Sequence, residues 1–311
     1  MQLAFLIDPL STLHPKKDTS VFLMEKAQKL GIDCCIFTQD TLVARDNSIS
    51  AAIHRIHIGN IQQSDWASTS ALGIQNLQMF DCILMRQDPP MNREYLYATY
   101  ALEIAEQHGV SVLNHPQGVR DTNEKFITAT LPQCCPPTVI TRDLATLLLF
   151  WDTHRSIILK PLDGMGGTGI FHIDEGGRNL HVAIEMLSQH GRHSILAQAY
   201  LPEIHGAGDK RIMVLNGDPL PFALRRMPLA GEHRANLAAG GRGDITPLTE
   251  RDRWLCAEIK PLLQARGLSF VGVDVIGDYI TEVNVTSPTC LREICEQSGT
   301  DYASPYLESL L

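Results

Sequence analysis

Hydrophobic positions in the first third of the chain alternate between two periods. Four short apolar runs predict buried β-strands, at 2–8, 32–37, 80–86 and 110–113. Between them, apolar side chains recur at helical spacing over 19–30 and 93–108. Gly31 and Gly109 follow these segments, where a helix end favours a left-handed residue, and Thr19 or Ser20 can cap the first helix. Strands that alternate with helices predict an α/β layer with a parallel sheet.

The pattern changes along the rest of the chain. Residues 47–78 have weak periodicity with polar interruptions, and we predict an irregular insertion there. Beyond about residue 120, strand pairs are divided by turn signals, Leu-Asn-Gly-Asp-Pro at 215–219 and Ile-Gly-Asp-Tyr at 276–279. Helical patterns recur near 143–154, 179–190 and 249–266. This part predicts an α+β unit, and without a long linker we expect a rigid interface with a site between the units.

Composition narrows the class of protein. The chain has 311 residues, 44% hydrophobic and 20% charged, which is enough for packed layers with cores. The net charge of -9, with no long basic cluster, argues against nucleic acid as a partner. No apolar run approaches the roughly 20 residues that span a bilayer, and no basic leader precedes the first strand, so we expect a cytoplasmic protein without a membrane partner.

Cysteine and histidine add little chemistry. The eight cysteines show no Cys-x-x-Cys spacing and include two adjacent pairs, so we expect reduced and mostly buried thiols. No histidine follows Cys290 closely, and we interpret that residue as a packed thiol rather than a nucleophile. The twelve histidines lack metal-ligand spacing, and no zinc site is predicted.

The most informative stretch is residues 157–171, where an apolar strand leads Lys160 into a glycine-rich loop. Gly164, Gly166, Gly167 and Gly169 leave backbone N–H groups unobstructed, so successive amides can converge on anionic oxygens beside the lysine charge. The lysine precedes the glycines, which fits neither common nucleotide-binding motif. A polyphosphate loop and a purely structural glycine turn are the two interpretations.

A strand near the C-terminus carries oxygen ligands. Glu282 and Asn284 lie two apart and therefore point to the same face, an arrangement that suits Mg²⁺. The alternative is a half-solvated strand with polar residues outward. A two-residue turn would pair Asp274 with Thr281 and place it on the opposite face, whereas a three-residue loop at 277–279 or a bulge would pair it with Glu282. If Asp274 joins the site, we predict the longer loop or a bulge.

Arginines recur in the second half. Asp209 and Arg211 open a strand-like segment, and Arg226 lies near the end of its expected hairpin partner across Asn216–Gly217. The guanidinium fork suits planar oxyanions, although charges at strand ends are often only solvated. Residues 231–243 have too many glycines for a helix and too few apolar residues for a core, and we predict a mobile substrate loop.

Together, in this order, these segments resemble the ATP-grasp ligases, and among them the prokaryotic glutathione synthetase family. The resemblance spans nearly the whole chain and rests on Asp8-Pro9, Lys16 to Ser20, Met85 to Pro90, Ala98 to Tyr100, Arg120 to Lys125, Leu159 to Gly167, Gln198 to Pro202, Gly208 to Arg211, Asn236 to Gly241 and Glu282 to Thr289. Arg-Asp-x-Asn-Glu-Lys and Asn-Val-Thr-Ser-Pro-Thr-Cys are the most specific of these motifs.

The resemblance implies an N-terminal Rossmann-like (pre-ATP-grasp) domain, α/β in class, followed by an α+β ATP-grasp fold with a glycine-rich lid. The implied domains are a substrate domain at 1–121, a lid subdomain at 122–202 and a C-terminal subdomain at 203–311 with the metal and substrate site. The implied reaction joins γ-glutamylcysteine to glycine through an acyl phosphate and yields glutathione, ADP and phosphate. Family precedent implies a homotetramer.

The resemblance also implies residue roles. ATP would be held by Lys125, Lys160, Gly164, Gly166, Gly167, Gln198, Tyr200, Leu201 and Asp209. Mg²⁺, for which Mn²⁺ can substitute, would be held by Asp274, Glu282 and Asn284. Arg211 and Arg226 would offset charge in phosphoryl transfer. The peptide and glycine would be bound by Arg234, Asn236, Thr286, Ser287, Pro288, Thr289 and Arg292.

Two alternatives stay open. Another ATP-grasp amino-acid or peptide ligase would share the ATP and Mg²⁺ residues but should lack the Arg/Asn-rich segment 225–243. A non-catalytic nucleotide-binding regulator should have lost a lysine or a metal ligand, and none is missing.

Overall fold

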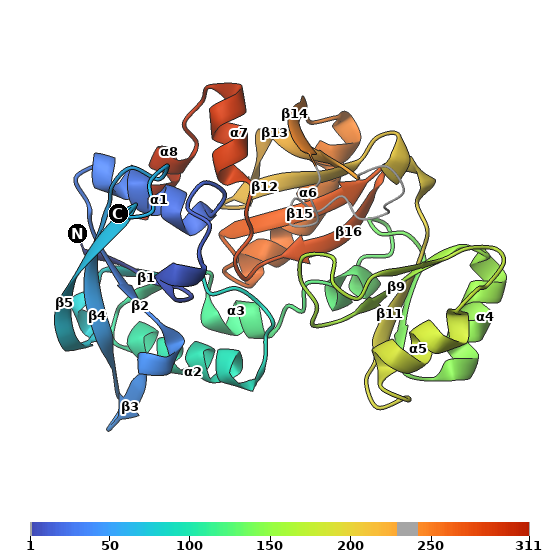
Figure 1. Cartoon of the computed structure of the whole chain (residues 1–311), viewed down its shortest axis with the longest axis horizontal. Coiled ribbons are helices and arrows are strands. Elements are labelled where there is room, and N and C mark those ends of the chain that lie inside the picture. Colours follow the sequence, from blue (N-terminus) through green and yellow to red (C-terminus); the bar gives the residue numbers. More distant parts are fainter. Residues whose placement is uncertain (1, 229–241, 311) are drawn as a thin grey trace.

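The computed structural model describes residues 2–228 and 242–310, which form three sheets and eight α-helices (Figure 1). The helices are α1 (Thr19–Lys29), α2 (Arg93–Gln107), α3 (Pro116–Arg120), α4 (Leu144–His154), α5 (Leu180–Ser188), α6 (Glu250–Ala265), α7 (Leu291–Ser298) and α8 (Ala303–Glu308). The positions of α1, α2, α4, α5 and α6 confirm the helices expected from hydrophobic spacing.

The first sheet is parallel at its centre. Its parallel strands, in the order β2-β1-β6-β7, are β2 (Asp33–Phe37), β1 (Gln2–Leu6), β6 (Cys82–Met85) and β7 (Ser111–Leu113). This confirms the α/β prediction for the first third of the chain. Gly31 and Gly109 have φ of 74° and 91°, as expected for residues that follow a helix end.

The cap of α1 is one residue earlier than predicted. The Asp18 carboxylate accepts a hydrogen bond of 2.8 Å from the backbone N–H of Val21, so the prediction of Thr19 or Ser20 was wrong. Asp is as good a cap as Ser or Thr. Thr19 and Ser20 are instead buried in the first turn, so packing of the helix decides which of three adjacent capping residues is used.

The prediction of an irregular insertion at 47–78 was also wrong. Two antiparallel strands of the first sheet fill this segment, β4 (Ser48–Ile58) and β5 (Ala67–Asn76), and β3 (Val43–Arg45) pairs with β4 just before it. The pairing register of β4 shifts between Ile53 and His54. Before the shift every second residue of Ile49–Ile53 is buried, and beyond it the buried side chains are Ile56 and Ile58. The bulge changes the phase of the alternation, which hides the period of two in the sequence.

The second sheet belongs to a separate layer, at the right in Figure 1. Its strands, in the order β10-β9-β11-β8, are β10 (Phe171–Ile173), β9 (Ile157–Pro161), β11 (Ile195–Ala199) and β8 (Thr138–Thr141). Leu147 of α4 and Ile184 of α5 pack with Leu159 and Ala197 of this sheet in a buried cluster of its own. The layer therefore has a small core independent of the rest of the molecule.

The third sheet is antiparallel. Its order is β14 (Arg242–Pro247), β13 (Asp218–Met227), β12 (Asp209–Leu215), β15 (Phe270–Ile276) and β16 (Tyr279–Asn284). Asn216 and Gly217 form the two-residue turn between β12 and β13, with φ of 52° and 86°. Two positive φ angles are the signature of a type I′ hairpin, and the predicted hairpin is confirmed.

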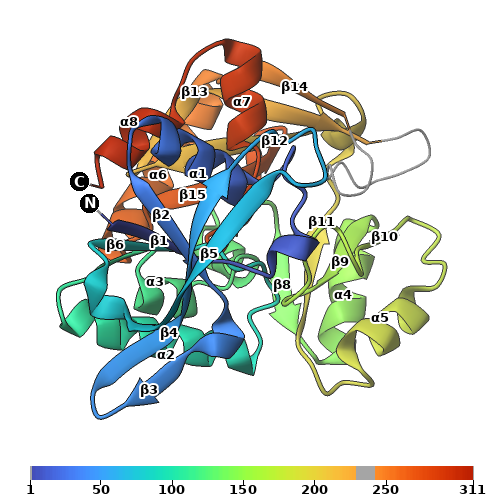
Figure 2. The same cartoon turned by 60° about the vertical axis from the view of Figure 1, so that its left-hand side comes forward.

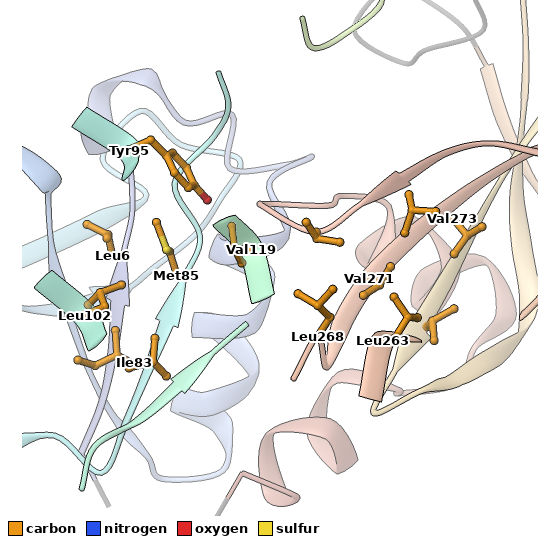
Figure 3. Close-up of a cluster of buried hydrophobic side chains, with 14 of the residues drawn as sticks. Leu6, Ile83, Met85, Tyr95, Leu102, Val119, Leu263, Leu268, Val271 and Val273 are labelled. Carbon is orange, nitrogen blue, oxygen red and sulfur yellow. The ribbon is translucent and has the colours of Figure 1, made fainter. Parts of the chain in front are cut away.

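The first and third sheets share one buried cluster (Figure 3). Ile83 and Met85 of β6 lie in the same cluster as Val271 and Val273 of β15. Asn114 joins the two units further, because its amide donates to the carbonyls of Phe270 (2.9 Å) and Val285 (2.7 Å). These contacts agree with the expected rigid interface, although the exact domain boundaries stay a prediction.

All eight cysteines are buried and unbridged, which confirms the prediction of reduced, buried thiols. Burial raises the pKa of Cys34 and of Cys82 to about 12. Within the described residues, no helix has the length and apolar character needed to cross a membrane.

Candidate active site

A cavity of about 1110 Å³ lies where the three sheets meet. The first unit contributes Asp8 and Asp88 to its wall, and the layer of the second sheet contributes the loop after β9. The third sheet contributes strands β12, β13, β15 and β16. The cavity lies between the units, where the site was expected. The predicted site residues that line it are Lys125, Lys160, Gly164, Gly166, Gly167, Gln198, Tyr200, Leu201, Asp209, Arg211, Arg226, Asp274, Glu282, Asn284 and Thr286 to Thr289.

Lys160 and the glycine-rich loop form one wall. Lys160 is the fourth residue of β9, and its ammonium donates to the side-chain oxygen of Gln198 at 3.2 Å. Burial lowers the pKa of Lys160, against the opposing effect of Glu282. Gly166 and Gly167 have φ of 61° and 81°, a conformation that favours glycine. A buried cation thus lies beside a loop whose backbone amides can turn toward an anion.

A second buried lysine connects the glycine-rich loop to the third sheet. The ammonium of Lys125 donates to the Gly164 carbonyl at 2.5 Å and pairs with the Glu282 carboxylate at 2.9 Å. Only 5% of its side chain is exposed, so the charge is directed into the cavity wall rather than into bulk solvent. Lys125 and Lys160 therefore place two positive charges around the same loop.

The pairing of β15 with β16 decides the face of Asp274. Ile276 pairs with Tyr279, so the turn has two residues, but the register shifts and Asp274 pairs with Glu282. The predicted condition for Asp274 to join the site is met by a bulge rather than by the longer loop. Asn284 lies on the same face, and its amide nitrogen is 3.4 Å from the Asp274 carboxylate.

Two arginines and two carboxylates form a buried network beside this face. Arg211 binds Asp274 through both Nε (2.5 Å) and Nη2 (2.9 Å). Arg226 pairs with Asp274 at 2.9 Å and also donates to Asp209. Although burial acts in the opposite direction, Arg211 and Arg226 hold the pKa of Asp274 well below its usual range. Burial raises the pKa of Asp209 to about 6, against the effect of Arg226.

The absence of a side chain at Gly272 leaves room for the side chain of Arg211. A Cβ atom at this position of β15 would lie 2.9 Å from Cδ of Arg211 and 2.9 Å from Cβ of Pro288. Any side chain there would push the arginine or the segment around Pro288 out of position. The sequence-predicted arginine thus depends on a glycine 61 residues further along the chain.

Asp274, Glu282 and Asn284 are the oxygen donors predicted to hold a metal ion. Among residues 2–228 and 242–310, no group of three or more His, Cys, Asp or Glu side chains is arranged to hold a metal ion. Asp274 is engaged by two arginines, which leaves Glu282, the partner of Lys125, and Asn284 as the predicted oxygen ligands that no arginine holds. Such a pair fits Mg²⁺, which commonly takes one or two protein oxygens together with phosphate oxygens and water.

Glu124 lines the cavity, although it was not among the candidate site residues predicted from the sequence. It accepts hydrogen bonds from the backbone N–H of Val285 (2.8 Å) and from both the backbone N–H (3.0 Å) and hydroxyl (2.8 Å) of Thr286. Burial raises its pKa and Glu282 adds to this effect, against the three hydrogen bonds. Its only sequence signal was its place in the Arg-Asp-x-Asn-Glu-Lys motif. In the structure it orients the polar loop that follows β16.

One described substrate residue, Arg292, is not brought together with the others. Arg292 is buried against α1, where it pairs with Glu25 at 2.5 Å and lies over the Phe22 ring at 4.7 Å, outside the cavity lining. Arg234 and Asn236, with most of the predicted loop at 231–243, lie outside the described residues. Cys290 lines the cavity as a buried thiol with a pKa raised by burial, in agreement with a packed side chain.

Sequence comparisons agree with this geometry. Residues 1–120 match the family model described as "Prokaryotic glutathione synthetase, N-terminal domain", and residues 124–299 match "Prokaryotic glutathione synthetase, ATP-grasp domain". The glutathione synthetase of Pseudomonas aeruginosa is 46% identical over 310 residues, which cover 100% of this chain and 97% of that protein. The glutathione synthetase of Escherichia coli K12 is 45% identical over 296 residues, which cover 94% and 92%.

Solved structures share the fold. D-cycloserine synthetase DcsG superposes with a TM-score of 0.71 at 15% identity, over 100% of this chain and 98% of its own. The ATP-grasp ligase PsnB, complexed with its minimal precursor, Mg and ADP, gives a TM-score of 0.63 at 17% identity, over 99% and 96%. At these identities the comparison establishes the ATP-grasp architecture and nothing about substrate.

Proposed function

The chain belongs to the prokaryotic glutathione synthetase family, and from this premise we propose how its cavity carries out ATP-dependent ligation of γ-glutamylcysteine with glycine. It is a glutathione synthetase of the ATP-grasp class. The observation that carries the assignment of the site is the convergence of Lys125, Lys160, Arg211 and Glu282 on one cavity beside the glycine-rich loop.

The reaction we propose has two steps. A carboxylate oxygen of the cysteinyl residue attacks the γ-phosphorus of ATP, and ADP leaves, so that an acyl phosphate is formed. The glycine amine then attacks the acyl carbon, phosphate leaves, and the amine loses a proton as the peptide bond forms. The enzyme needs no covalent nucleophile for either step, which agrees with the buried Cys290. Catalysis rests on positioning and on charge stabilisation.

Buried cations supply the charge stabilisation. Lys125 and Lys160 bind the ATP phosphates, and the backbone amides of Gly164 to Gly167 close on the same oxygens. Arg211 and Arg226 offset the charge that develops during phosphoryl transfer. Held by Glu282 and Asn284, with Asp274 behind them, Mg²⁺ or Mn²⁺ would neutralise phosphate charge. Because these groups are buried, each interaction is stronger than it would be in water.

The adenosine part of ATP, the dipeptide and glycine occupy the rest of the cavity. The adenine binds to backbone groups around Gln198 to Leu201, with Asp209 near the ribose. The polar loop Thr286 to Thr289, oriented by Glu124, binds the peptide carboxylates. Arg234, Asn236 and Arg292 are proposed to assist, although in this structure Arg292 has Glu25 as its ion-pair partner.

Other features are proposed on family precedent. We propose a cytoplasmic homotetramer. We also propose domains at 1–121, 122–202 and 203–311, a division that gives each domain one of the three sheets. An ATP-grasp ligase for other amino acids is the second candidate, but the Arg/Asn-rich segment 225–243 favours the tripeptide product.

The test is ADP release by purified protein with ATP and Mg²⁺, in which γ-glutamylcysteine and glycine are supplied separately and together. Mass detection should find glutathione only when both are present. ADP release with other acceptors, and none with this pair, would support the alternative ligase. ATP binding without turnover on any acceptor would support a regulator.

A further inference from the structure

The connection between β4 and β5 reaches the cavity. Ile61, Gln62, Gln63, Ser64 and Trp66 all line it, although no role in the reaction has been assigned to any of them. Figure 2 shows the long β4–β5 hairpin, which is part of the first sheet. We call residues 59–66 the hairpin tip.

The hairpin tip has a defined backbone. The N–H of Gly59 donates to the Trp66 carbonyl at 2.7 Å and closes the base of the tip. Inside it, the N–H of Gln63 donates to the Asn60 carbonyl at 3.0 Å, and the N–H of Gln62 donates to the Asn60 side chain at 3.0 Å. These bonds use backbone groups and Asn60, which leaves the side chains of Gln62, Gln63 and Ser64 for the cavity.

Apolar contacts hold the hairpin tip against the core. Ile61 and Trp66 pack on the same buried cluster as Leu13, which lies in the loop before α1. At the end of β4, Gln28 of α1 exchanges two hydrogen bonds with the backbone of Ile58, at 3.0 and 3.1 Å. The hairpin tip and the loop before α1 therefore form one supported wall, and groups held in this way can select a ligand.

The position and charges of the wall formed by the hairpin tip and the loop before α1 indicate which substrate it contacts. The proposed nucleotide residues lie on the second and third sheets and on the segment just after α3. The first unit also lines the cavity with charges of both signs, Lys16 and Lys17 from the loop before α1 and the pair Asp8 and Asp88, which are joined by a 2.8 Å hydrogen bond from the Asp88 N–H to the Asp8 carboxylate. Mixed charges of this kind suit a zwitterionic amino-acid end rather than a polyphosphate. Neutral amides and a hydroxyl offer both donors and acceptors to such a group.

We propose that Gln62, Gln63 and Ser64 contact γ-glutamylcysteine and determine selectivity for its γ-glutamyl end. The inference rests on the proposed function, because it assigns a further wall of the same site. It gives the segment 47–78 a role in substrate recognition.

The kinetic test is the triple variant Gln62→Ala/Gln63→Ala/Ser64→Ala. The KM for γ-glutamylcysteine should rise at least about fivefold, because the substrate loses the hydrogen bonds that these side chains make to it. The KM values for ATP and for glycine should stay within twofold of wild type. The Tm should be unchanged within experimental error. The matched control is Ser68→Ala/Thr69→Ala/Ser70→Ala, three exposed residues of β5 outside the cavity lining, which should change no KM.

A KM for γ-glutamylcysteine within twofold of wild type would overturn the inference, as would an equal rise in the KM for ATP. Failure of the proposed function is distinguishable, because then the wild-type protein forms no glutathione. A binding test that needs no turnover uses Trp66 as the single tryptophan, in the background Trp151→Phe/Trp254→Phe. With ADP present, γ-glutamylcysteine should shift its emission and free glycine should not; no shift with the dipeptide would count against the hairpin tip.

Discussion

Arg211→Lys separates the charge of this residue from its geometry. Arg211 binds both oxygens of Asp274, and only 7% of its side chain is exposed. Lysine keeps the positive charge but presents one ammonium group, which cannot make both parallel bonds. The variant should therefore fold with the network weakened and with its cation displaced from the proposed path of phosphoryl transfer.

The expected magnitudes differ for stability and for catalysis. Loss of one charge-assisted hydrogen bond in a buried pair costs about 1.5–3 kcal/mol of unfolding free energy. Loss of a positioned donor to transition-state charge costs about 10²–10³-fold in kcat. The KM for ATP should change much less, because Lys125 and Lys160 still hold the phosphates.

Glutathione formation at saturating substrates measures kcat, and urea unfolding measures stability. The matched control is Arg120→Lys. Arg120 also pairs with a carboxylate, Glu103 at 2.8 Å, but lies outside the cavity lining. The control should keep kcat within twofold of wild type. A kcat within threefold of wild type for Arg211→Lys would refute a role in the chemical step, and an equal loss in the control would point to a general effect on folding.

Three further predictions concern stability, nucleotide binding and the thiols. Burial raises the pKa of Glu106 to about 7, and Glu103 adds to this against Arg120. The unfolded carboxyl ionises near its ordinary value of 4.5, so this group lowers stability progressively between about pH 4.5 and 7. Glu106→Gln should therefore be more stable than wild type by about 1 kcal/mol at pH 8 and equal to it at pH 4, allowing for partial solvent screening; an equal gain at both pH values in urea unfolding would contradict this origin. Lys160→Met should raise the KM for ATP at least about tenfold, in line with a lost charged contact. Lys26→Met, which removes a partly exposed pair with Asp301, should leave that KM unchanged, and an unchanged KM in Lys160→Met would remove the residue from the ATP site. In the native protein, a thiol reagent should modify none of the eight buried cysteines quickly, whereas in denaturant it should modify all eight. Rapid modification of several cysteines in the native protein would contradict their burial.

Much of the site was readable in the sequence because its signals are local. The run before Lys160 and the glycines after it occupy one short stretch, and period two places Glu282 and Asn284 on one face whatever the rest of the chain does. The turn at Asn216–Gly217 follows from residues that adopt positive φ. Even the bulge next to the two-residue turn at 277–278 was one of the two arrangements predicted for Asp274 to reach the site.

The tertiary structure decided the features that depend on distant packing. The hairpin at 48–76 was missed because a bulge changes the phase of the alternation in β4, and only pairing with the parallel sheet reveals that β4 buries side chains on both sides of the bulge. Glu124 accepts a hydrogen bond from Thr286, 162 residues away, and Glu25 accepts one from Arg292, 267 residues away. Local propensity acts over a few residues, so it can place a side chain on a face but cannot choose its partner. That choice is made where the three sheets pack together around the cavity.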